Sequence, residues 1–184
     1  MKRVVIPALV LAAAGLLTTA CGSTDRVASA TASAPVAYHN DEDVMFAQMM
    51  IPHHRQAVEM AKLAEGRAGS QVKELAGKIE AAQEPEIRTM SGWLTAWGAQ
   101  ASGEHGMPGM PGMMSDQDME ELRGLSGAAF DRAFLTLMVQ HHEGAVAMAK
   151  REQAGGAYEP ARRMAADIVT SQSAEIATMR RLLR

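Results

Sequence analysis

Four of the six histidines in this 184-residue chain occur as two adjacent pairs, each flanked by methionines at the same spacing. A methionine precedes each pair by three residues, and a second follows it by six. The residues are Met50, His53, His54 and Met60 in the first copy, and Met138, His141, His142 and Met148 in the second. Imidazole and thioether are ligand types of copper sites, and thioether favours Cu(I) in particular. The pattern therefore predicts copper binding by these eight side chains, in one shared site or in two.

The two copies belong to an internal repeat with an offset of 88 residues. Between residues 43–62 and 131–150, ten of twenty aligned positions are identical. A single histidine on an apolar helix face is usually a hydrogen-bonded core residue, and methionines at helical spacing usually fill a core. The recurrence of four histidines in register with methionines favours the metal site over these structural interpretations.

A second repeated group follows each histidine pair at an offset of 89 residues. Its possible metal ligands or supporting residues are Glu86, Met90, Glu175 and Met179. The glutamates could accept a hydrogen bond from a histidine N–H, bind the metal directly, or lie at the rim of the protein. Pro85 precedes the first glutamate and predicts a kink of the helix or an interruption of its hydrogen bonds there.

A segment rich in methionine, proline and glycine separates the two copies, between Gly98 and Ser115. Its possible ligands are His105, Met107, Met110, Met113 and Met114. We expect little core for these methionines to fill. The segment either wraps a soft ion such as Cu(I) or Ag(I), or is a mobile, oxidisable loop.

Helices must position these residues, because apolar residues recur at steps of three and four throughout both copies. The pattern predicts long helices over about 40–65, 70–97, 126–153 and 158–183, and a short helix over 116–123. Asn40, Ser70, Ser115 and Ser126 are the expected N-caps. A composition of 47% hydrophobic but only 4% aromatic residues suits packed helices.

The connections between the predicted helices indicate the fold class. A short connection within each copy makes its two helices antiparallel neighbours, and one long connection joins the copies. We therefore predict an all-α, ferritin-like four-helix bundle made of two repeated helical hairpins. The domain should cover residues 39–184, with a Met-rich crossover loop at 99–115.

The N-terminus has the features of an export signal. Lys2 and Arg3 precede an apolar stretch and small residues, which predicts a signal peptide over residues 1–20. Cys21, the single cysteine, then fits the lipidation site of a bacterial lipoprotein, with a flexible tether over 21–38. The expected location is the outer face of the cell membrane; the alternative is ordinary secretion with a free thiol.

Several function classes lack their motifs in this chain. The formal net charge is −3 and no basic run is present, which argues against nucleic acid as a partner. No nucleophile motif, phosphate-binding loop or H-E-x-x-H motif occurs. No glutamate is followed three residues later by histidine, which disfavours a di-iron enzyme. We predict no enzyme activity and no organic cofactor.

The segments FAQMMIPHHRQAVEMA, FDRAFLTLMVQHHEGAVAMAK and AQEPEIRTMSGWL resemble the DUF305 family of bacterial exported proteins over about residues 40–184. The resemblance implies a ferritin-like four-helix fold and, for some members, copper binding and copper tolerance outside the cytoplasm. The positions that match the family motif are the eight histidines and methionines named above.

These observations predict an exported protein that binds copper to sequester it or to confer tolerance. Two alternatives remain open. The chain could be a non-catalytic interaction or structural lipoprotein without metal, or a copper-dependent redox enzyme.

Overall fold

The computed structural model describes residues 38–101 and 110–184, which belong to one compact unit. These ranges form five helices and contain no strand, so the predicted all-α class is confirmed. The helices are α1 (Asp41–Arg67), α2 (Ser70–Trp97), α3 (Asp116–Gly124), α4 (Gly127–Gly155) and α5 (Glu159–Leu182). The predicted signal peptide, Cys21, His105 and Met107 lie outside the described residues. No helix within the described ranges is long and apolar enough to span a bilayer.

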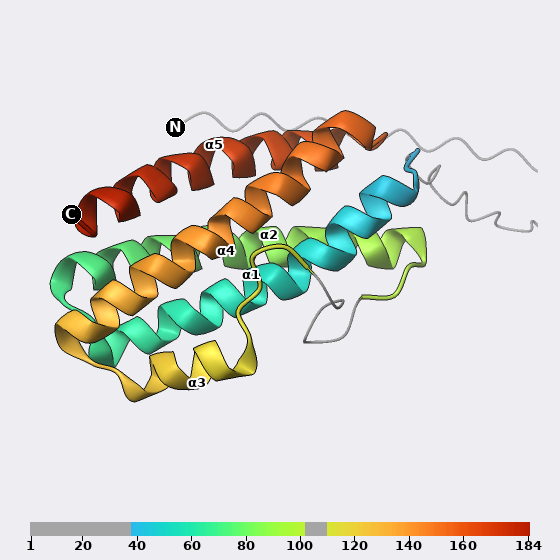
Figure 1. Ribbon diagram of the computed structural model, residues 1–184. Helices are drawn as coiled ribbons and strands as arrows, with labels where there is room; N and C mark the ends of the chain where they lie inside the picture. Colours follow the sequence, from blue (N-terminus) through green and yellow to red (C-terminus); the bar gives the residue numbers. More distant parts are fainter. Residues whose placement is uncertain (1–37, 102–109) are drawn as a thin grey trace, which may run out of the picture. The chain divides into compact units, whose positions relative to one another are not determined.

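The helices pair as two hairpins. α1 packs along α2, and α4 packs along α5, as Figure 1 shows. α1 and α4 also contact each other, so the two helices that carry the histidine pairs lie together at the junction of the hairpins. The short α3 contacts α4. The predicted four-helix bundle of two repeated hairpins is confirmed.

Local sequence determines some helix ends. Asn40 caps α1 by accepting from the backbone N–H groups of Glu42 and Asp43, both at 3.1 Å, and the Asp43 carboxylate accepts from the Asn40 N–H at 2.7 Å. Ser115 and Asp118 form the same capping box at α3. These reciprocal bonds satisfy backbone donors that the first helical turn leaves free.

Other helix ends differ from the prediction. Ser70 is the first residue of α2 rather than its cap; the N-cap is Gly69, which has no side chain to accept a bond. Ser126 occupies the N-cap position of α4, but its side chain makes no capping hydrogen bond. α2 continues through Pro85 to Trp97 as one helix, although Pro85 has no backbone N–H to donate to the preceding turn.

Two aspartates bind the turn of the opposite hairpin. Asp43 on α1 accepts from the backbone N–H groups of Ala157, at 3.1 Å, and Tyr158, at 2.9 Å, in the α4–α5 turn. Asp131 on α4 accepts from the N–H of Gly69 in the α1–α2 turn, at 3.0 Å. The repeat therefore holds its two copies together by equivalent contacts in both directions.

The buried apolar residues form two clusters. The Phe130 cluster contains Met60, Met114, Met138 and Met179, together with Phe130 and Phe134. The Phe46 cluster contains Met50, Met90, Met110 and Met148, together with Phe46 and Ile51. Along α1, the histidine pair lies between Met50 of one cluster and Met60 of the other; along α4 it lies between Met138 and Met148. The histidines thus form a polar layer between the two apolar clusters.

Candidate metal centre

The structure brings all four paired histidines into the core, where each is at most 1% exposed. We call them the histidine layer. His53 from α1 and His141 from α4 are in direct ring contact, with centroids 3.8 Å apart and planes tilted by 39°. Residues 88 positions apart therefore meet where α1 and α4 contact each other, a proximity that the repeat alone did not predict.

The other two histidines contact the outer helices. His54 Nε2 lies 2.8 Å from Glu86 Oε2 on α2, and His142 Nε2 lies 2.7 Å from Glu175 Oε2 on α5. Both histidine side chains are fully buried, whereas the glutamates are 23% and 22% exposed. The predicted recurrence of the two glutamates thus corresponds to two equivalent histidine–carboxylate contacts.

Five ring nitrogens in the histidine layer are buried and make no hydrogen bond in the part of the chain that the structure describes. They are Nδ1 of His53, His54 and His142, and both nitrogens of His141. A buried polar atom without a partner costs about 1–3 kcal/mol. Such a concentration of free imidazole nitrogens at one place fits a site that receives a metal ion.

Burial keeps the central pair neutral. Desolvation lowers the pKa of His53 to about 3, with His54 adding to the shift and the Pro111 carbonyl opposing it. Desolvation also lowers the pKa of His141 well below its usual value, and the neighbouring His53 adds to this; a weak interaction with the His53 backbone opposes the shift. Neutral imidazole carries the lone pair that a metal ion requires.

Residues 110–115 run across α1 and α4 beside the histidine layer, and we call them the crossing segment (Figure 1). His53 Nε2 lies 3.0 Å from the carbonyl oxygen of Pro111. Gln56 on α1 makes two bonds with the backbone of Met114: its amide donates to the carbonyl at 2.9 Å and its oxygen accepts from the N–H at 2.7 Å. These contacts fix the crossing segment to α1.

Two glycines allow the crossing segment to approach α4. A Cβ atom at Gly144 would lie 2.1 Å from the carbonyl oxygen of Pro111. Gly112 has φ +78°, and a Cβ there would lie 2.8 Å from the carbonyl oxygen of Gln140. Gly144, Gly112 and Gln56 were not predicted as site residues. A glycine inside the long helical pattern of α4 was the available signal, because such a glycine often marks a close approach.

The expectation that the Met-rich segment has little core to fill is wrong for two residues. Met110 is 7% exposed and belongs to the Phe46 cluster, while Met114 is 5% exposed and belongs to the Phe130 cluster. Each cluster therefore holds four buried helix methionines and one from the crossing segment. Met113 is partly buried against the Phe46 cluster.

The histidines and carboxylates alone do not form a closed cage. In residues 38–101 and 110–184, no group of three or more His, Cys, Asp or Glu side chains is placed to hold a metal ion. A metal site here would need donors beyond these side chains, and methionine sulfur combined with imidazole nitrogen would suit a soft ion.

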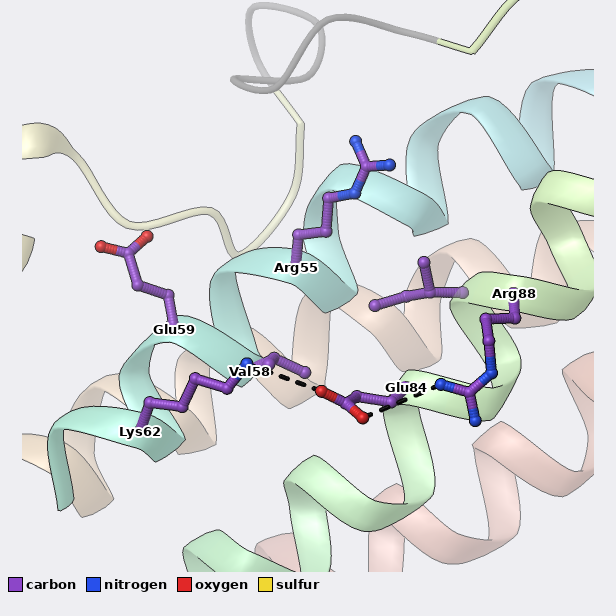
Figure 2. A pocket seen from close by; sticks show the side chains of 7 residues that line it. Arg55, Val58, Glu59, Lys62, Glu84 and Arg88 are labelled. Carbon is purple, nitrogen blue, oxygen red and sulfur yellow. Dashed lines mark ion pairs between the residues drawn. The ribbon is translucent and has the colours of Figure 1, made fainter. Parts of the chain in front are cut away.

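A separate surface cleft of about 500 Å³ lies between α1 and α2 (Figure 2). Its charged side chains pair with one another: Lys62 Nζ lies 3.5 Å from Glu84 Oε1, and Arg88 Nη1 lies 3.8 Å from Glu84 Oε2. None of the four paired histidines lines this cleft. It is therefore distinct from the candidate metal centre.

Comparison with known proteins identifies the family of this chain. Residues 43–183 match the family described as "Domain of unknown function (DUF305)". The chain belongs to the DUF305 family. No curated protein matches this DUF305 chain.

Solved structures of DUF305 proteins share its fold. A DUF305 protein from Streptomyces coelicolor is 36% identical, with a TM-score of 0.73, over 77% of this chain and 91% of its own. A DUF305 fragment from Deinococcus radiodurans is 35% identical, with a TM-score of 0.71, over 78% and 96%. CopM in its Cu(II)-bound form is 33% identical, with a TM-score of 0.67, over 77% and 95%. CopM is also known in Cu(I)-bound and Ag-bound forms.

Proposed function

We propose that this DUF305 protein binds copper ions at the histidine layer and thereby sequesters them outside the cytoplasm. The observation that carries the proposal is His141. Its ring is 1% exposed, lies against His53, and leaves both nitrogens without a hydrogen bond. In this proposal copper is the ion that the protein sequesters, not a catalytic cofactor.

The donor types support copper over harder ions. The imidazoles of the histidine layer have methionines in sequence register on both sides, and these methionines belong to the two apolar clusters. The ligand candidates are His53, His54, His141, His142, Met50, Met60, Met138 and Met148. Nitrogen and thioether donors suit both oxidation states of copper, with thioether favouring Cu(I). CopM, a structural relative, has been solved with copper in both states.

Sequestration rather than catalysis fits the burial of the site. All four histidines are at most 1% exposed, so a bound ion would be shielded from small substrates in solution. The signal-like residues 1–20 and Cys21 support export with a lipid anchor at the outer face of the membrane. Copper binding there would lower the free ion concentration before it reaches the cytoplasm.

The test is a titration of the purified protein with Cu(I) against a competing chelator. The parent is compared with a variant in which His53, His54, His141 and His142 are all replaced by glutamine. Lys62→Gln, in the cleft of Figure 2, is the control for a surface change on the same helix. Tight binding that the histidine variant loses and the control keeps supports the proposal.

A second variant separates the histidine layer from the Met-rich segment. Replacing Met107, Met110, Met113 and Met114 by leucine removes the thioethers and nearly conserves side-chain volume, so the buried positions of Met110 and Met114 and the contact of Pro111 with His53 are retained. Binding lost only in this variant would move the site to the segment. Absence of Cu(I) binding by the parent protein would overturn the proposed function and leave a helical interaction module.

A further inference from the structure

We infer that Glu86 and Glu175 are positioning residues that make His54 and His142 bind the ion through Nδ1. The inference rests on the proposed copper function and specifies the donor atoms. Each glutamate holds the opposite ring nitrogen, Nε2, at 2.8 Å and 2.7 Å respectively.

The chemistry of the contact determines which nitrogen is free. A carboxylate only accepts hydrogen bonds, so the Nε2 atom that meets it carries the hydrogen. In a neutral imidazole, the lone pair is then on Nδ1. In both His54 and His142, Nδ1 is buried and has no hydrogen-bond partner among the described residues. These two atoms are therefore the available donors of the outer histidines.

The exposed fractions of the side chains indicate which edge of each histidine ring faces the interior. Both histidine side chains are 0% exposed, whereas their glutamates are 22–23% exposed. The carboxylates thus approach from the solvent side, and the opposite edge of each ring faces the interior. A second hydrogen bond of this kind usually fixes the tautomer and the orientation of a metal-binding histidine.

The two contacts form although the residue before each glutamate differs. Pro85 precedes Glu86, whereas Ala174 precedes Glu175. The two hydrogen bonds nevertheless differ by only 0.1 Å, taking 2.8 Å minus 2.7 Å. The exchange of proline for alanine before the glutamate therefore leaves the contact unchanged.

The glutamates fit a positioning role better than a ligand role. In each, Oε2 is already occupied by the Nε2–H of its histidine. Neither carboxylate joins two other His, Cys, Asp or Glu side chains in a metal-holding group within the described ranges. Their effect on the ion would pass through the histidines that they orient.

The direct test uses Ag(I) as a diamagnetic probe for Cu(I) on the purified, ¹⁵N-histidine-labelled protein. Long-range ¹H–¹⁵N correlation spectra assign the hydrogen and the silver-bound nitrogen of each ring. We expect the Nδ1 signals of His54 and His142 to shift and to couple to silver, while Nε2 keeps its hydrogen. Silver coordination through Nε2 of these two residues would overturn the inference.

Substitution provides a second readout. Replacing both glutamates by alanine removes the acceptors and should weaken Ag(I) binding about 10–100-fold. Replacing both by glutamine retains an acceptor oxygen and should restore most of the affinity and the Nδ1 pattern. Glu84→Ala is the matched control, because Glu84 is on the same helix and pairs with Lys62 and Arg88 instead of a histidine.

The outcomes separate the two proposals. A parent protein that binds no Ag(I) contradicts the proposed function itself. A parent that binds Ag(I) tightly, with unchanged affinity and unchanged coordinating nitrogens in the alanine variant, contradicts only the role of the glutamates. If the alanine variant does not fold, the spectra of the parent alone still decide which nitrogen binds silver.

Discussion

His53 Nε2 lies 3.0 Å from the carbonyl oxygen of Pro111, whereas neither ring nitrogen of His141 makes a hydrogen bond in the described structure. The two central histidines come from equivalent positions of the repeat, and the crossing segment makes them different. The Pro111 carbonyl only accepts, so His53 donates its Nε2–H to it and keeps Nδ1 as the free nitrogen, whereas both nitrogens of His141 are free. The two central histidines should therefore differ in the nitrogens that they offer to an ion.

The crossing segment can be displaced by one substitution. In Gly144→Ala, the new Cβ would meet the Pro111 carbonyl oxygen at 2.1 Å, which requires the segment to move. We expect the free energy of unfolding to fall by about 1–3 kcal/mol, and Cu(I) uptake to become faster. Denaturant unfolding and stopped-flow uptake measure the two effects.

Gly77→Ala is the control for that substitution. Gly77 also lies inside a long helix, but a Cβ there would meet nothing within 4 Å. Alanine is the better helix former, so this variant should gain about 0.5–1 kcal/mol and take up Cu(I) at the parental rate. A Gly144→Ala protein as stable as the Gly77→Ala protein would show that the segment does not lie against α4.

The methionines that flank the histidine pairs in sequence can be tested as metal ligands separately from their role in packing. Met50→Leu and Met138→Leu nearly conserve volume, so each should cost less than about 1.5 kcal/mol of stability. If sulfur binds the ion, Cu(I) affinity should fall at least about tenfold. Met119→Leu, also buried in the Phe130 cluster but on α3, should leave Cu(I) affinity unchanged.

Copper should stabilise the folded protein. A ligand that binds only the folded state at about 100 times its Kd adds about 2.7 kcal/mol to the free energy of unfolding. The thermal midpoint should rise on addition of Cu(I) and return on addition of a chelator. The variant with all four histidines replaced by glutamine should show no rise; an equal rise in that variant would place the stabilising ion elsewhere.

Stability should also depend on a carboxyl pair away from the histidines. Asp43 and Glu152 are both fully buried, and neither Glu152 carboxyl oxygen has a hydrogen-bond donor among the described residues, so a favourable contact between the two carboxyls requires a proton on one of them. Burial, and then the contact with Asp43, raises the pKa of Glu152 from 4.5 to about 8. Burial alone would raise the pKa of Asp43, but hydrogen bonds from Asn40, Tyr158 and others outweigh it and lower this pKa.

The sign of the effect follows from the proton on Glu152. The folded state holds this proton up to about pH 8, whereas the unfolded state releases it near 4.5. The contribution to stability is complete below pH 4.5 and is lost as the pH rises through 8. The lowered pKa values of His53 and His141 act in the opposite direction, but only below their usual value of 6.5.

Between pH 6.5 and 8, the free energy of unfolding should therefore fall by about 2 kcal/mol. Glu152→Gln keeps a neutral hydrogen-bonding group beside Asp43 and should flatten the profile in this range. Urea unfolding across the range measures both proteins. A parent profile as flat as that of the variant would show that Glu152 is already ionised near neutral pH.

Much of this architecture could be predicted from the sequence. The apolar spacing of three and four residues identified the helices, because one face of a helix must be buried. The offset of 88–89 residues related the two hairpins. It placed Glu86 and Glu175 in equivalent positions relative to the histidine pairs.

Tertiary structure alone decided which groups meet. Ser70 is not a cap, because Asp131 of the other hairpin takes the N–H of Gly69. The pairing of Asp43 with Glu152 has no signal in the repeat, since the residue equivalent to Glu152 is Ala64. The crossing segment has no periodic pattern, and its position depends on the missing Cβ of Gly144 and on hydrogen bonds to distant residues. Sequence periodicity records which face of a helix is buried, but the hydrogen bonds that select partners across helices form only once the helices are packed.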